Sequence, residues 1–237
     1  MHYVLLIKAH KKYYDVEPRS IKYNVYMNQL KNWRIWDNPR LPEDEIRKLF
    51  DFVRGWDRYF VGDVKRFRRL YQEIFPMIVE LKGKNITKIK LNEDLRRKIS
   101  YVFNKVALGV SRDGKYRATD ASKILHTILP ELFVMWDAYI RESILGSKYP
   151  WYSTAWSSQP DGGFHYAYRF LPKMQAELME AVRSCMHEKG FKYEDESINY
   201  IRSQCDGNTL AKLADEYNYV KYTLPKVRKD YLRVSWV

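Results

Sequence analysis

The sequence predicts an all-α fold, and two observations favour it. Almost every strong periodic segment spaces its apolar residues as one face of a helix does. Several of these segments also begin or end with residues that cap helices. The length of 237 residues suits one domain, or two small lobes that share a cleft. We therefore expect a single two-lobed helical domain over residues 1–237.

Five segments predict amphipathic helices. The first has Pro42 and three acidic residues in its opening turn, which favours a helix start there. Pro76 predicts a kink or break in the second, Asn92 is the expected N-cap of the third, and Gly190 is the expected C-cap of the fourth. In chain order, the five segments are 41–53, 64–81, 92–108, 163–189 and 208–219.

Two further helices are expected between residues 118 and 142. Asp120 or Thr119 can cap a helix over 121–129, because either side chain accepts a hydrogen bond from a free backbone N–H. A second helix is expected to open around Asp137, whose carboxylate would lie at the positive end of the helix dipole.

Lys123 on the first of these helices permits two interpretations. It stands three residues before His126, so the two share a helix face. A nucleophilic Lys123 that faces the fixed carboxylate of Asp137 would form a base-excision site. A solvated lysine and an ordinary capping aspartate explain the same residues without any chemistry.

Composition indicates the kind of partner. The chain has 42 Lys and Arg against 29 Asp and Glu, a formal charge of +13, which predicts nucleic acid or an anionic membrane surface as partner. The apolar stretches are short and interrupted by charge, which does not support a membrane, so we expect nucleic acid and no membrane as partner. The first residues do not resemble a signal peptide, so we expect an intracellular protein. Cys185, Cys205 and His187 have no metal-ligand spacing; we expect inert or buried thiols and no metal or other cofactor.

A glycine-bearing hairpin at 109–121 leads into the helix of Lys123. Its backbone N–H groups, with Lys115, Arg117 and Arg112, are expected to bind a DNA phosphate. The order of hairpin, Ser122–Lys123 and Trp136–Asp137 resembles the helix-hairpin-helix DNA glycosylases of the 8-oxoguanine type. In this chain the hairpin glycines stand farther apart, and the lysine-to-aspartate spacing is shorter.

The resemblance implies a role in base-excision DNA repair on duplex DNA. It places a helix-hairpin-helix element around residues 95–145 and a second helical part over 146–237. It also implies that Lys123 attacks the sugar C1′ and that Asp137 stabilises the developing sugar cation. The lysine route, with its lyase step, needs a neutral amine, which burial near cations such as Arg141 would favour. If Lys123 does not face the cleft, Asp137 and water could still release the base.

Aromatic residues are the candidates for holding a flipped base by stacking. Trp151 and Trp156 stand in a long polar loop, Trp36 stands in an earlier one, and His165 follows the first loop on a helical segment. The alternative is that the loop packs over a helical core and that His165 is an ordinary surface histidine.

Two other functions compete with a glycosylase. A Mg²⁺-dependent nuclease uses two carboxylates and a lysine, and this chain offers Asp63, Glu80 and Lys82. The sequence around Glu80 and Lys82 predicts a helix, however, on which these two side chains would point in different directions. A non-catalytic DNA- or RNA-binding protein would need only a basic surface. No dinucleotide, P-loop, zinc-protease or nucleophile-elbow motif is present, which removes those classes.

Overall fold

The structure is a computed structural model that describes residues 1–31, 37–146 and 162–228. Within these ranges the regular elements are helices, apart from one isolated antiparallel bridge between Gly62 and Ser111. The predicted all-α fold is therefore confirmed. None of the helices in these ranges has both the length and the apolar character needed to cross a membrane.

The regular elements of the described residues are all helical and are named here in chain order. The first six are α1 (Tyr3–Val16), α2 (Ser20–Lys31), α3 (Glu43–Trp56), α4 (Val64–Leu81), α5 (Glu93–Gly109) and α6 (Ala118–Ile128). The next are α7 (Ala138–Leu145), α8 (Gly162–His165), the π-helical turn η3 (Tyr166–Phe170) and α9 (Leu171–Lys189). The last are α10 (Glu194–Ser203), α11 (Leu210–Asn218), the π-helical turn η4 (Tyr219–Thr223) and α12 (Leu224–Val227).

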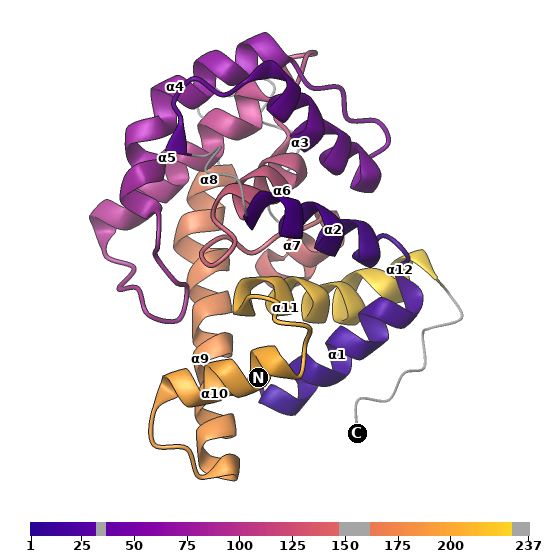
Figure 1. Ribbon diagram of the computed structural model, residues 1–237, viewed down its shortest axis with the longest axis vertical. Coiled ribbons are helices and arrows are strands. Elements are labelled where there is room, and N and C mark those ends of the chain that lie inside the picture. The colour runs from indigo at the N-terminus through magenta and orange to yellow at the C-terminus, as the bar shows by residue number, and fades with distance from the viewer. Residues whose placement is uncertain (32–36, 147–161, 229–237) are drawn as a thin grey trace.

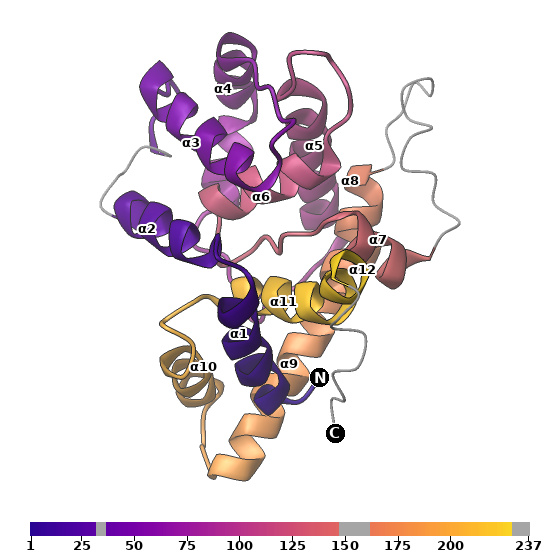
Figure 2. The same cartoon turned by 90° about the vertical axis from the view of Figure 1, so that its right-hand side faces the viewer.

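The helices form two groups around one continuous apolar core (Figures 1 and 2). In the upper group, α4 packs against α3 and α5, and α6 packs against α3 and α5. In the lower group, α1 packs against α9 and α11, and α10 packs against α9. In both views α11, a helix of the lower group, lies below α6 and above α10.

Local capping chemistry explains where several helices begin and end. The Asn92 side chain accepts a hydrogen bond from the Leu95 N–H (2.9 Å) and caps α5. Gly190 ends α9 in the left-handed conformation, with φ of 68°. Both caps confirm the sequence predictions. Of the kink or break expected at Pro76, the break is absent, because α4 continues from Val64 to Leu81 with the proline inside it. Buried apolar residues on both sides of the proline pack both halves of α4 against the core.

The predicted caps of the Lys123 helix are also wrong. Helix α6 begins three residues earlier than expected, and Arg117 occupies the N-cap position without a side-chain cap bond. The backbone N–H of Arg117 donates to the Ala107 carbonyl (2.8 Å), which brings the chain against α5 at the start of α6. Asp120 therefore lies inside the first turn, buried, and Thr119 accepts a hydrogen bond from Arg141 instead (2.7 Å).

Helices α1, α2 and α10 were not among the predicted elements. Helix α1 buries Tyr3, Leu6, His10 and Tyr13 on one face, but tyrosine and histidine are only partly apolar and weaken the sequence pattern. This face matters for the site, since α1 brings Tyr13 beside α11. Cys185 and Cys205 are free and buried, as expected.

Candidate active site

Lys123 and Asp137 line the same cleft, which we call the lysine cleft. It has a volume of about 220 Å³ and lies between α6, the start of α7, α1 and the α11–η4 region. This volume is many times the space that one water molecule needs. The lining residues come from both groups of helices and are Tyr13, Arg19, Trp56, Lys123, Met135, Trp136, Asp137, Asp215, Tyr219, Thr223 and Val227.

Two side chains of α6 hold the segment that carries Asp137. The Ser122 hydroxyl accepts a hydrogen bond from the Trp136 N–H (3.2 Å), and His126 Nδ1 lies 2.6 Å from the Phe133 carbonyl oxygen. Burial lowers the pKa of His126 to about 3, so the ring is neutral, with Nδ1–H donating to the carbonyl and Nε2 accepting from the Tyr23 hydroxyl (2.7 Å). Ser122 and His126 thus position the aspartate relative to Lys123.

Asp137 is held through both carboxylate oxygens. Oδ1 accepts from the Ile140 N–H (2.9 Å), which confirms the predicted N-cap of α7. Oδ2 accepts from the Thr223 hydroxyl (2.6 Å), which is supplied by η4 more than eighty residues later. A carboxylate fixed in this way keeps further lone pairs and its negative charge directed at the cleft.

Lys123 is buried, which the sequence alone could not show. The residue is 8 % exposed, and burial lowers the pKa of its amine, outweighing the carboxylates of Asp120, Asp57 and Asp137, which raise it. Among the cations, Arg19 acts on Lys123 and lowers this pKa further. A lowered pKa increases the fraction of neutral amine, the form that acts as a nucleophile.

Aromatic rings from distant parts of the chain form the walls of the lysine cleft. The Tyr13 and Trp56 rings are nearly parallel (12°) with centroids 6.5 Å apart, and Tyr219 meets Tyr13 edge to face at 5.3 Å. Arg19 lies over the Trp56 ring at 4.9 Å. These residues were not among the predicted site residues, because nothing in their local sequence separates them from core aromatics.

A buried ion pair forms another side of the lysine cleft. Asp215 Oδ2 accepts from Lys212 Nζ (2.7 Å), and Lys212 also lies 3.7 Å from Glu216. Burial raises the pKa of Asp215 to about 6, although Lys212 lowers it. Asp215 therefore adds a second carboxylate, beside Asp137, to the lining of the cleft.

The other predicted site residues lie elsewhere. His165 is buried at the end of α8 and does not line the lysine cleft, so it is neither a cleft residue nor a surface histidine. Trp36, Trp151 and Trp156 lie outside the described residues.

The predicted hairpin connects α5 to α6 and is braced by the loop that follows α3. The Arg112 N–H donates to the Val61 carbonyl (3.0 Å), and the Asp63 N–H donates to the Val110 carbonyl (3.1 Å). Lys115 and Arg117 lie 3.4 and 3.0 Å from Asp113, and the Lys115 side chain is largely exposed. Trp56 is the last residue of α3 and lines the lysine cleft. The loop that follows it therefore begins at the cleft and extends to the hairpin, to which it is hydrogen-bonded.

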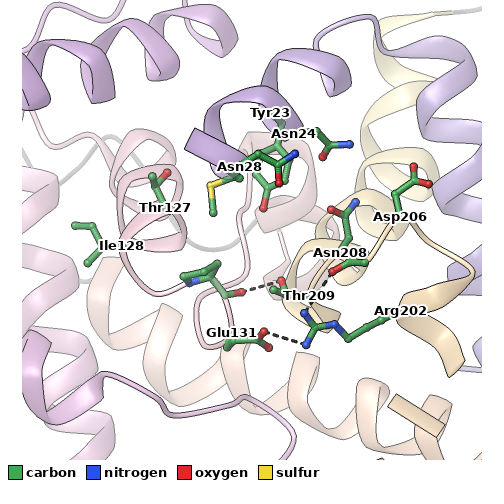
Figure 3. A pocket seen from close by; sticks show the side chains of 13 residues that line it. Tyr23, Asn24, Asn28, Thr127, Ile128, Glu131, Arg202, Asp206, Asn208 and Thr209 are labelled. Atoms are coloured by element: carbon green, nitrogen blue, oxygen red, sulfur yellow. Dashed lines mark hydrogen bonds and ion pairs between the residues drawn. The ribbon is translucent and has the colours of Figure 1, made fainter. Parts of the chain in front are cut away.

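A second cavity, of about 360 Å³, lies between α2, the end of α6 and the loop before α11 (Figure 3). Its polar side chains are largely used within the protein: Arg202 pairs with Glu131 (3.1 Å), and the Thr209 hydroxyl donates to the Pro130 carbonyl (2.8 Å). It contains neither Lys123 nor Asp137. The lysine cleft is therefore the stronger candidate active site.

The three candidate nuclease residues, Asp63, Glu80 and Lys82, do not form a common site. Asp63 caps the start of α4, whereas Glu80 is near the end of this 18-residue helix, so a rise of about 1.5 Å per residue separates them far beyond a shared metal ion. Glu80 pairs with Lys98 (2.6 Å), and Lys82 pairs with Asp37. Among the described residues, no group of three or more His, Cys, Asp or Glu side chains could hold a metal ion.

Comparison with protein-family models gave no match to this chain, and comparison with curated proteins and with solved structures gave none either.

Proposed function

We propose that this protein is a DNA glycosylase that flips a damaged or modified base into the lysine cleft and releases it from the sugar. The observation that carries the proposal is that a buried lysine and a helix-capping aspartate line one aromatic-walled cleft. The chain's formal charge of +13 supports a polyanionic substrate.

Each part of the cleft has a role in this reaction. The aromatic rings of Tyr13, Trp56 and Tyr219 offer faces on which a base can stack. The negative charge of Asp137 stabilises the sugar cation that develops as the glycosidic bond breaks. The neutral amine of Lys123 attacks C1′, so that the enzyme also acts as a lyase.

The hairpin supplies the DNA contacts in the same proposal. Lys115, Arg112 and Arg117 bind phosphates next to the extruded nucleotide, and the loop after α3 connects these residues to the cleft. A non-catalytic DNA-binding protein would need these surface cations alone. It would have no use for a buried lysine, whose desolvation costs free energy.

The test is base release and covalent trapping on a panel of duplexes that carry oxidised, deaminated, alkylated or bulky modified bases. The wild type is expected to release a base from at least one duplex and to form an adduct that borohydride traps. Lys123→Gln should abolish the adduct, because only an amine forms a Schiff base. Lys11→Gln, at an exposed position of α1, is the matched control. Tight binding with neither base release nor adduct across the panel would favour the non-catalytic alternative.

A further inference from the structure

Asp120 is a buried carboxylate that the proposed reaction has not yet used. It is 1 % exposed and lies one helical turn before Lys123 on α6. Its Oδ1 is 3.9 Å from Lys123 Nζ and has no hydrogen-bond partner in the described part of the chain. Asp120 lies in the first turn of α6, where the helix dipole favours a negative charge, but it does not cap the helix, so its carboxylate is not used in a cap hydrogen bond.

Other charges act on this pair from several elements. Asp57 at the end of α3, Arg117 before α6 and Arg141 on α7 act on Asp120. Asp57, Asp137 and Arg19 act on Lys123. Burial raises the pKa of Asp120 to about 6, against the lowering effect of Lys123, so that Asp120 can gain and lose a proton near neutral pH.

We propose that Asp120 moves the proton that converts the covalent Lys123 adduct into a Schiff base. This inference rests on the proposed glycosylase function. Asp120 acts through the Lys123 nitrogen and is therefore a positioning and proton-transfer residue rather than a part of the base pocket.

The reaction from attack of the amine to the Schiff base conserves protons and electron pairs. The Lys123 amine forms the N–C1′ bond, and the electron pair of the glycosidic bond leaves with the base, which takes a proton from solvent. The nitrogen, now a secondary ammonium, gives one proton to the Asp120 carboxylate. Its lone pair then forms the C=N bond as the C1′–O4′ bond breaks, and the proton on Asp120 passes to O4′. The products are a protonated Schiff base, an O4′ hydroxyl and an ionised Asp120.

A purely electrostatic role for Asp120 predicts a different outcome. The carboxylate favours the charged form of Lys123, so Asp120→Asn lowers the pKa of the amine further and leaves more of it neutral. If Asp120 only adjusted this charge, base release and adduct formation would rise together in Asp120→Asn. If Asp120 transfers the proton, base release is kept while Schiff-base formation falls.

The experiment measures base release and borohydride-trapped adduct in the same single-turnover reactions. For Asp120→Asn we expect base release at or above the wild-type rate, and trapping reduced on the order of 10²-fold, the usual contribution of a general acid or base. Asp57→Asn is the matched control, since it removes a neighbouring charge that touches neither reacting atom. It should keep the wild-type ratio of adduct to released base.

Three outcomes would overturn the inference. The first is an unchanged ratio of adduct to released base in Asp120→Asn, and the second is an equal loss of adduct and released base in that variant. The third is a wild type that releases base but forms no adduct. In each of these the wild type still releases base, whereas absence of base release by the wild type means that the proposed function itself fails. If Asp120→Asn does not fold, the wild type decides, because its ratio of adduct to released base should rise with pH through about 6 as Asp120 ionises. A flat ratio would contradict the proposal.

Discussion

Replacing Asp137 with asparagine tests whether the charge at the N-terminus of α7 serves catalysis rather than folding. An asparagine Oδ1 can still accept from the Ile140 N–H, and its amide can donate to the Thr223 hydroxyl, so both hydrogen bonds can survive. Asparagine and aspartate cap helices about equally well, and we expect the free energy of unfolding to change by less than about 1 kcal/mol. Loss of the charge should slow base release by roughly 10²–10³-fold, as loss of one preorganised electrostatic group does.

Two further variants separate charge from structure. Asp137→Ala removes the cap and leaves the Thr223 hydroxyl without its acceptor, at a combined cost of about 2 kcal/mol in unfolding free energy. Thr223→Val keeps the charge and should slow base release by less than about ten-fold. Denaturant unfolding, DNA affinity and single-turnover base release are measured for each variant. Base release by Asp137→Asn at the wild-type rate would refute the role of the charge, and parallel losses of stability and turnover would assign Asp137 to folding.

Three other predictions follow from the charge, the cleft walls and a buried histidine. Affinity for duplex DNA should fall steeply between low and physiological salt, because each neutralised phosphate releases counterions; affinity that does not change with salt would count against this. Trp56→Ala should weaken binding of a duplex with an extruded base by about 1–3 kcal/mol and spare undamaged duplex, as should Trp151→Ala if the aromatic loop also stacks on the base; equal losses on both duplexes would indicate a folding role. Burial lowers the pKa of His10, but its contacts with Glu216 (2.8 Å) and Asp206 (3.4 Å) together raise it more, to above its ordinary 6.5. The stability from these contacts is therefore fully present below pH 6.5 and is lost as the pH rises through the raised pKa; His10→Gln should remove this part of the pH dependence of unfolding, and an unchanged profile would exclude the contacts as its source.

The sequence by itself determined the helical class and the boundaries of several helices. The caps at Asn92, Asp137 and Gly190 depend on contacts within a few residues, so the local sequence contains all the information they need. The order of Lys123 and Asp137 along the chain was visible for the same reason. The cap predicted at Asp120 was wrong, because the hydrogen bond between the Arg117 N–H and α5 makes α6 begin three residues earlier.

The tertiary structure alone decided the character of the site. The pKa of Lys123 depends on how much water reaches its amine, and this is set by packing of α6 against α3 and α5 and by the cleft walls that α1 and α11 supply. The aromatic walls combine Tyr13, Trp56 and Tyr219, whose positions along the chain are far apart. Long-range packing brings these rings together, and no periodicity within one segment reports on it, so the sequence pointed to the aromatic loops as the base pocket instead.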